Sequence, residues 1–185
     1  MPKIIKKKSI FRSKLFDIKE ADIEFKNNIL KYEIISGTGN GAVLIVPIIN
    51  NDIIFIKEYA AAVDDYMITL PKGKIDQGET IIEAANRELQ EEISYKSSEI
   101  KLIKKLYLAP GYIDHITYVM VAKDLSASSL SGDEPEELEV IRVNREDVHS
   151  FLHKHDIVDS RVYAAISFIE KPWVNTTSIN TYHLF

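Results

Sequence analysis

The sequence contains no cysteine among its 185 residues. This absence excludes disulfide bonds, thiolate nucleophiles and cysteine-based zinc sites. No stretch of the chain reaches the length of a membrane span, and residues 1–8 are basic without the apolar run of a secretory signal. We therefore expect a cytoplasmic protein.

The chain also lacks an excess of positive charge, since its formal net charge is −5 at pH 7. This charge argues against a general polyanion binder, such as a protein that coats DNA or RNA. It does not exclude small phosphorylated substrates, because metal ions can bridge acidic side chains to phosphates.

The chain does contain enough apolar material for a packed core. Apolar residues make up 45% of it, with nine tyrosines and seven phenylalanines, a composition that argues against global disorder. Its length suits one domain of ordinary size, or one domain with a small appendage. No internal repeat or low-complexity segment is present.

Apolar runs and turn residues predict an alternation of strands and helices. Residues 9–36 are strand-rich and contain a hairpin with its turn at 26–28. Residues 37–41 are predicted to be a linker or tight turn rather than a phosphate-binding loop, because no helix start follows them. Further strands are predicted at residues 42–49, 53–56, 100–107, 112–121 and 138–143. Helices are predicted at residues 80–94, from 144 or 145 to 153, and at 160–171.

The helix at residues 80–94 carries closely spaced glutamates. Thr80 followed by Glu83 is a capping box, so Thr80 should be the N-cap. The residues predicted to form the buried stripe of this helix are Ile82, Ala85, Leu89 and Ile93. Three glutamates at i, i+3 and i+4 should cluster on one flank of that stripe, namely Glu88, Glu91 and Glu92.

The glutamates belong to a longer pattern over residues 73–95, G-x5-E-x7-R-E-[apolar]-x-E-E-x-S-[apolar]. This pattern resembles the Nudix box and differs from it only at Ser94, where the box has glycine. Glycine would provide a left-handed cap for the helix, so Ser94 must either adopt that conformation at some cost or let the helix run on. Because Ser94 contributes no metal ligand, we expect activity to survive the difference.

The acidic cluster predicts a metal site. Carboxylates at this spacing repel one another, which costs free energy, and a bound divalent cation removes this repulsion. Hard oxygens suit Mg²⁺ or Mn²⁺ rather than Zn²⁺. The three glutamates alone would favour a solvated acidic face, but Gly73, Glu79 and Arg87 in register with them favour the metal site. Glu79 and Arg87 are expected to orient the loop and the carboxylates rather than to touch substrate.

Flanking segments resemble the NudE-type ADP-compounds hydrolases of the ADP-ribose pyrophosphatase-like branch. The segments that carry the resemblance are residues 56–60, 84–89, 108–112 and 131–136. The resemblance implies an α/β (α+β) Nudix fold, with a mixed sheet sandwiched between helices over residues 42–185. Residues 1–41 would form an antiparallel β-appendage that builds a homodimer by exchange of strands. A two-stranded unit is marginal alone, which gives this pairing a physical motive.

The resemblance also implies a reaction, the hydrolysis of the pyrophosphate bond in ADP-ribose, NADH and diadenosine polyphosphates with release of AMP. Two or more Mg²⁺ ions, or Mn²⁺, would be held by Glu88, Glu91, Glu92 and the backbone carbonyl of Lys72. Catalytic roles are implied for Arg87, Glu91 and Glu92. The general base would be Glu136, with Glu134 and Glu137 as alternatives, although a solvated acidic loop gives the same pattern.

Contacts to the nucleotide are less well defined. Glu58 and Tyr59 are candidates for adenine or ribose contacts, and the end of a strand and a core aromatic fit them equally. Tyr112, next to the turn at 109–111, is a candidate pocket residue for which core packing is at least as good an interpretation.

Other classes of function have weaker support. His149 and His153 are spaced i, i+4 but lack the glutamate of a zinc-protease motif, so we expect surface histidines, as for His155. His115 and His183 carry no spacing signal. A Nudix-like nucleotide sensor without turnover would tend to lose box carboxylates, and this chain retains them. Nucleoside triphosphates or a capped RNA end are the alternative substrates, and the acidic charge counts against RNA.

Overall fold

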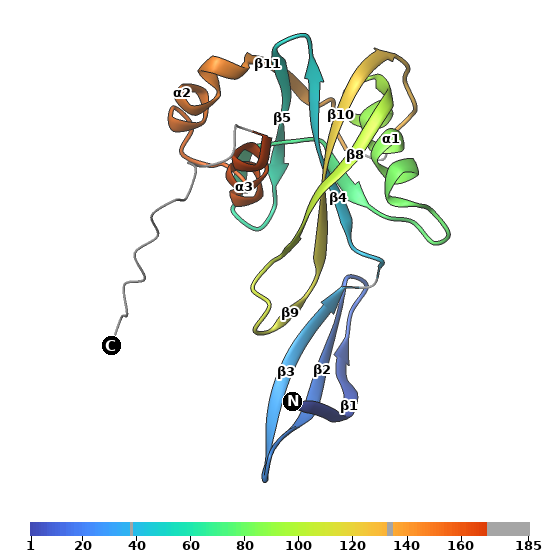
Figure 1. The fold of residues 1–185 in the computed structure, drawn as a ribbon, viewed down its shortest axis with the longest axis vertical. Helices are drawn as coiled ribbons and strands as arrows, with labels where there is room; N and C mark the ends of the chain where they lie inside the picture. The colour runs from blue at the N-terminus through green and yellow to red at the C-terminus, as the bar shows by residue number, and fades with distance from the viewer. Residues whose placement is uncertain (38, 133–134, 170–185) are drawn as a thin grey trace, which may run out of the picture.

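The computed structural model describes residues 1–37, 39–132 and 135–169 (Figure 1). Predictions for Glu134, Lys171 and His183 therefore lie outside the described residues. The central sheet of the described chain has the order β11-β5-β4-β10-β8, with β6 added to β5 and β7 added to β4. These strands are β4 (Ala42–Ile49), β5 (Asp52–Ala60), β6 (Asp65–Thr69), β7 (Lys72–Lys74), β8 (Tyr95–Tyr107), β10 (Ile116–Ala127) and β11 (Glu139–Asn144). The sheet is mixed, because β4 and β10 run parallel while the other pairs are antiparallel.

Helices cover both faces of this sheet, as Figure 1 shows. They are α1 (Ile81–Glu92), the 3-10 turn η1 (Arg145–Asp147), α2 (Val148–His153) and α3 (Ser160–Ile169). On β4, Leu44 and Val46 pack with α2 and α3, while Val43 and Ile45 pack with α1. Side chains alternate along a strand, so this division places one hydrophobic cluster on each face. The predicted sandwich of a mixed sheet between helices is confirmed.

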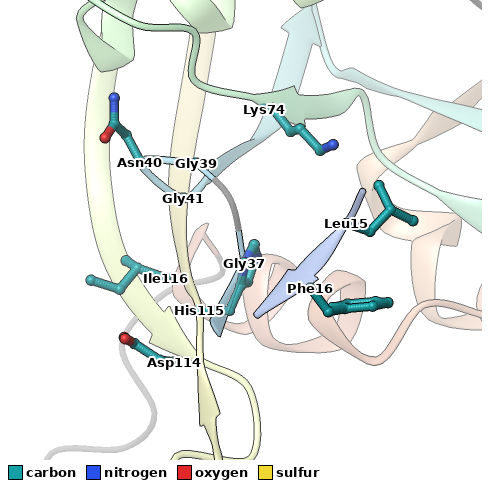
Figure 2. A pocket seen from close by; sticks show the side chains of 10 residues that line it. All are labelled: Leu15, Phe16, Gly37, Gly39, Asn40, Gly41, Lys74, Asp114, His115 and Ile116. Atoms are coloured by element: carbon teal, nitrogen blue, oxygen red, sulfur yellow. The ribbon is translucent and has the colours of Figure 1, made fainter. Parts of the chain in front are cut away.

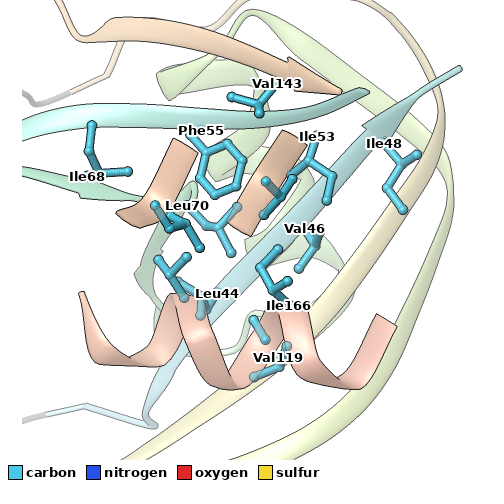
Figure 3. Packing of buried hydrophobic residues seen from close by; sticks show 14 of the residues in the cluster. Leu44, Val46, Ile48, Ile53, Phe55, Ile68, Leu70, Val119, Val143 and Ile166 are labelled. Carbon is cyan, nitrogen blue, oxygen red and sulfur yellow. The ribbon is translucent and has the colours of Figure 1, made fainter. Parts of the chain in front are cut away.

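The larger cluster lies between the sheet and the two C-terminal helices (Figure 3). Phe55 is fully buried at its centre and its ring packs against that of Phe151, with the centroids 5.2 Å apart. Strand β4 is buried along almost its whole length, because it has a covered surface on either side. No described helix is long and apolar enough to cross a membrane.

The N-terminal segment forms a second sheet beside the central sheet. It consists of β1 (Lys3–Arg12), β2 (Phe16–Phe25), β3 (Asn28–Gly37) and β9 (Ile113–Asp114). The predicted hairpin with its turn at 26–28 is confirmed. The expected two-stranded unit is wrong, since β1 adds a strand and β9 pairs with β3. Every residue of β1 is exposed, so the sequence shows no burial pattern there that would indicate a strand.

Helix α1 begins as predicted. The Thr80 hydroxyl accepts a hydrogen bond from the Glu83 amide at 3.2 Å, and the Glu83 carboxylate accepts one from the Thr80 amide at 2.8 Å. The predicted burial of Ile82 is wrong, because this side chain is half exposed. Glu88 and Glu92 lie in the buried face instead of on its flank, which rotates the face toward Ala84. The stripe was misplaced because apolar spacing cannot indicate that glutamates are buried.

Helix α1 ends at Glu92, and Ser94 has φ +58. Of the two predicted alternatives for Ser94, the left-handed conformation is therefore the correct one.

The strands predicted at 42–49, 53–56, 100–107 and 138–143 are confirmed, with β8 already starting at Tyr95. The single strand predicted at 112–121 is wrong, because it is divided into β9, which pairs with β3, and β10, which reaches Ala127 in the central sheet. The helix predicted to end at 153 consists of η1 and α2, and the one predicted from 160 is α3, described as far as Ile169. Strands β6 and β7 were not predicted.

Candidate active site on the acidic face of the first helix

The close approach of β7 to α1 places Gly73 against Glu88. A Cβ atom built on Gly73 would lie 1.9 Å from Glu88 Oε1, far inside van der Waals contact. A residue with any side chain at position 73 would therefore displace this carboxylate. The glycine of the box is needed here for close packing, since its φ is not in the left-handed region.

Arg87 connects the other charged residues of the box. Its Nε and NH2 groups contact the two oxygens of Glu79 at 3.0 and 3.1 Å, and NH2 also donates to the Lys74 carbonyl at 2.8 Å. Its NH1 group lies 2.6 Å from Glu88 Oε1 and 2.9 Å from Glu91 Oε2. The hydrogen bond from Arg87 holds the pKa of Glu79 below its usual range, and the Glu79 carboxylate raises the pKa of Arg87. These contacts agree with an orienting role for Glu79 and Arg87.

Glu92 is buried beside the start of β7. Its Oε2 accepts a hydrogen bond from the Lys72 amide at 3.0 Å. Burial raises the pKa of this carboxyl to about 9, while the positive charge and the amide of Lys72 act in the opposite direction. The carboxylate form therefore needs an added positive charge at neutral pH, and a divalent cation supplies one.

The donor set fits a hard divalent cation. Glu88, Glu91 and Glu92 offer oxygens within little more than one helical turn, and Gly73 leaves room beside Glu88. Within the described parts of the chain, no three acidic or histidine side chains already converge to a metal-binding arrangement. Arg87 instead balances Glu88 and Glu91, and the Lys72 amide holds Glu92. The ligand roles, including that of the Lys72 carbonyl, stay predictions.

Two grooves meet at Glu91 and Gly132. The first, of about 680 Å³, lies along β7 and α1 and is also lined by positively charged or ionisable side chains, namely Lys72, Lys74, Arg87, His115 and Arg161. The second, of about 490 Å³, is also bordered by Glu92 and Glu136. A site with carboxylates between two grooves and cationic groups along one of them suits a phosphate-containing ligand that carries metal ions.

Arg161 is positioned by a buried partner. Its NH2 group lies 2.6 Å from Asp159 Oδ2, and Thr69 also donates to this carboxylate. Burial alone would raise the pKa of Asp159, but the hydrogen bonds from Arg161 outweigh it and hold the pKa low. His115 faces the same groove, and burial, followed by the charge of Arg161, lowers its pKa.

The predicted base, Glu136, lies on the second groove together with Glu91 and Glu92. Its Oε2 accepts a hydrogen bond from the Tyr66 hydroxyl at 3.1 Å. The alternative Glu137 borders the same groove. The structure thus brings the loop glutamates to the box carboxylates, and the choice of the base stays a prediction.

The predicted substrate contacts are dispersed. Glu58 is paired with Lys72, with 2.6 Å between Oε2 and Nζ. Tyr59 and Tyr112 are 48% and 56% exposed, so the core-packing interpretation of both tyrosines is wrong. Tyr59 packs edge to face against Tyr66 near the end of β5, and Tyr112 lies in the turn before β9, where its carbonyl accepts from the Ile35 amide. Their contacts with substrate stay predictions.

Several residues that line the grooves, or contact a residue that does, were not identified from the sequence. Tyr66, His115 and Arg161 come from β6, the β9–β10 junction and α3, and no local motif connects them. Lys74 directly follows the box glycine and could have been found from that position. His149 and His153 are exposed on α2, as the surface interpretation predicted, and His155 packs against the Phe151 ring.

Comparisons with known proteins show the family of the chain. The NUDIX domain family matches residues 40–166. The chain is 37% identical over 174 residues to the ADP compounds hydrolase NudE of Escherichia coli, covering 94% of this chain and 93% of that protein. It is 32% identical over 171 residues to an ADP-ribose pyrophosphatase of Bacillus subtilis, covering 91% and 92%.

A solved structure described as an ADP compounds hydrolase superposes with a TM-score of 0.80 at 37% identity, covering 89% of this chain and 90% of that one. Nudix hydrolases generally use divalent metal ions, in agreement with the donor set described above. The chain therefore belongs to the Nudix family and is a hydrolase of the pyrophosphatase class.

Proposed function

We propose that this protein hydrolyses the pyrophosphate bond of AMP-containing compounds and releases AMP, with Mg²⁺ as the cofactor and Mn²⁺ as a possible substitute. The observation that carries the proposal is the position of Glu88, Glu91 and Glu92 between a cationic groove and the groove of Glu136. The names of the two relatives support ADP-ribose and other ADP compounds as the substrate class. NADH and diadenosine polyphosphates are part of the proposal.

The box residues would hold two or more ions through Glu88, Glu91, Glu92 and the Lys72 carbonyl. Bound ions would polarise the attacked phosphoryl group, acidify a water and neutralise the leaving phosphate. Arg87 keeps Glu88 and Glu91 together, and Glu79 fixes the orientation of Arg87. Reactions of this type depend on positioning and charge stabilisation, which these contacts supply.

The groove residues would bind the diphosphate and remove the proton of the attacking water. Lys74 and Arg161 offer positive charge along the first groove, and Asp159 keeps the Arg161 side chain in one orientation. Glu136 would accept the proton from its place on the second groove, where Tyr66 donates to it.

The protein is also proposed to be a homodimer, with residues 1–41 as the dimerisation unit and residues 42–185 as the hydrolase domain. The N-terminal sheet exposes many large apolar side chains, among them Ile4, Ile10, Phe11, Ile29 and Leu30. A second copy could cover such a surface. Light scattering after gel filtration measures the mass, and a monomer at micromolar concentration would contradict the dimer. A cytoplasmic location stays a prediction.

The proposed reaction is tested by incubating the purified protein with Mg²⁺ and, separately, ADP-ribose, NADH, diadenosine triphosphate and a nucleoside triphosphate. We expect AMP from the first three. Release only from the nucleoside triphosphate would favour the triphosphatase alternative, and no release from a folded protein, with Mn²⁺ also tried, would favour the nucleotide sensor.

Three variants test the residue roles. Glu92→Gln should abolish turnover while circular dichroism and thermal unfolding show an intact fold. For the base, Glu136→Gln should lower kcat by roughly 100-fold or more, the usual contribution of a general base. Glu137→Gln, in the same loop, should have a much smaller effect. The reverse order would move the base to Glu137.

A further inference from the structure

Lys72 and Glu58 form an ion pair at the edge of the cationic groove. Lys72 Nζ lies 2.6 Å from Glu58 Oε2, and the two side chains are only 18% and 13% exposed. Lys72 belongs to β7 and Glu58 to β5, and both strands pair with β4, so the sheet brings together residues that are 14 positions apart. Little water reaches this pair, so the loss of one member leaves the other in need of a new charged partner.

The backbone of Lys72 is held independently of its ammonium group. Lys72 pairs with Leu44 of β4, and its amide donates to Glu92 Oε2 at 3.0 Å. The side chain therefore pivots about a fixed Cα atom. Because the N–Cα bond is about 1.46 Å long, Glu92 Oε2 lies within about 4.5 Å of that atom. The four-carbon stem of lysine is long enough to carry the ammonium from Glu58 to Glu92.

Glu92 is the carboxylate that the ammonium would take if Glu58 were lost. Among the described residues, the Lys72 amide is the one hydrogen-bond donor to the Glu92 carboxylate. Burial raises the pKa of Glu92 and the positive charge of Lys72 lowers it, so the ammonium already acts on this group. Asp159 also lies in the electrostatic field of Lys72, but Arg161 and Thr69 occupy its oxygens.

Lys74, two residues further along β7, has different surroundings. Its side chain is exposed and lines the cationic groove. It also lines a neighbouring cavity, which is bordered by the linker at 37–41 and by His115 (Figure 2). An exposed ammonium can meet a phosphate without giving up a carboxylate partner. Lys74 therefore supplies charge to the groove, whereas the charge of Lys72 is matched by Glu58.

We propose that Glu58 is a positioning residue, which holds the Lys72 ammonium away from Glu92 and so keeps this carboxylate available to the divalent cation. Without Glu58, the ammonium pairs with Glu92, and a cation must displace it before it can bind. Glu58 thus raises the cation affinity of the box without touching the cation or the substrate. The inference rests on the proposed function, because it assumes that Glu92 is a metal ligand.

Titration of the full-length protein with Mn²⁺, followed by electron paramagnetic resonance of the unbound ion, tests this inference without turnover. Glu58→Gln should raise the Kd of Mn²⁺ by roughly ten-fold, because a charge-assisted hydrogen bond has to be broken first. The double variant Glu58→Gln/Lys72→Met has no ammonium at this position, and its Kd should return to within about three-fold of that of the unchanged protein. Glu139→Gln is the matched control, since it removes a carboxylate from Lys57, the neighbour of Glu58 on β5, and should not change the Kd.

The metal dependence of AMP release gives a second measurement. Glu58→Gln should need roughly ten-fold more Mg²⁺ for half-maximal release, in step with the Kd of Mn²⁺. Saturating Mg²⁺ should restore most of the lost rate, because the cation then displaces the ammonium. A lost rate that saturating Mg²⁺ does not restore, together with unchanged Mn²⁺ binding, would overturn the inference and assign Glu58 to the substrate. Thermal unfolding of each variant checks that the fold is retained.

The outcomes separate this inference from the proposed function. Weaker Mn²⁺ binding by Glu58→Gln that the added Lys72→Met restores supports the inference. Equal affinity of Glu58→Gln and the unchanged protein overturns it, and so does weak binding that Lys72→Met does not restore, since Glu58 would then act on the fold alone. If the unchanged protein binds Mn²⁺ but releases no AMP, the proposed function fails and the Mn²⁺ titrations still decide the inference. If it binds no Mn²⁺, the metal site is wrong and the inference is overturned with it.

Discussion

Replacing Gly73 with alanine should separate activity from stability. The added Cβ would lie 1.9, 2.1 and 2.3 Å from the three atoms of the Glu88 carboxyl group. Normal contact between such atoms needs about 3.5 Å, so the carboxylate must move by roughly 1.5 Å. The colliding atoms are the end of a side chain, and the backbone can stay in place. The Arg87–Glu88 contact of 2.6 Å would be lost in this movement.

The expected magnitudes follow from this displacement. Loss of one charged hydrogen bond costs about 2 kcal/mol, which lowers Tm by roughly 4–8 °C in a chain of this length. A catalytic group misplaced by about 1 Å can cost about 100-fold in rate, so kcat/KM for AMP release should fall by at least that factor. Mg²⁺ dependence should shift to higher concentrations, because Glu88 is one of the proposed ligands.

A control that lowers stability away from the site separates these effects. Ile53→Val in the larger hydrophobic cluster, on the face of the sheet opposite α1, should cost about 1 kcal/mol. It should leave kcat/KM unchanged. The reasoning would be refuted if Gly73→Ala kept kcat/KM within about three-fold of the unchanged protein. It would also be refuted if the two variants lost activity in parallel, since the effect would then come from stability.

Three further predictions concern other parts of the site. Ser94→Gly should raise the free energy of unfolding by about 1 kcal/mol, because Ser94 has φ +58, and a decrease in a denaturant titration would contradict this. Tyr66→Phe removes the donor to Glu136 and should lower kcat by roughly two- to ten-fold. A kcat equal to that of the unchanged protein would exclude a positioning role for Tyr66. With a chelator present, the free energy of unfolding should fall as the pH rises from 4.5, the ordinary pKa of a glutamate, to about 9. Over this range folded Glu92 holds a proton that the unfolded chain has released. Glu92→Gln should flatten this pH dependence, and a flat curve for the unchanged protein would contradict the raised pKa of Glu92.

Much of the fold was predictable because buried strands and helices carry apolar residues at regular spacing in the sequence. Strands β4 and β5 are apolar on both faces, and residues that alternate along β4 do enter clusters on opposite sides of the sheet. Strand β1 has no such apolar pattern, since all its residues are exposed and lysines occupy much of this edge strand. Ile82 shows the opposite error. Its apolar side chain predicted burial, but the buried face of α1 contains Glu88 and Glu92 and leaves Ile82 half exposed.

The site was predictable to the extent that its residues are contiguous. Glu88, Glu91 and Glu92 share one helix, so a spacing rule identifies them together. Tyr66 meets Glu136 across 70 positions, and Arg161 joins the groove of Lys72 from a helix near the end of the described chain. Such contacts between residues distant in the sequence depend on the order of the strands in the sheet and on which loops that order brings together. A single sequence contains no local signal for them.

The contacts of Arg87 explain how Glu88 and Glu91 can lie close together without a cation and still be able to hold one as proposed. Only NH1 touches Glu88 and Glu91, whereas Nε and NH2 bind Glu79 and the Lys74 carbonyl. A cation held by the two carboxylates, as proposed, would therefore displace one nitrogen of the guanidinium and leave the rest anchored. The Asp76 amide fixes Glu79 in turn, at 3.0 Å. The helix thus keeps its acidic residues near the positions proposed for cation binding, so that little ordering would be needed when cation and substrate bind.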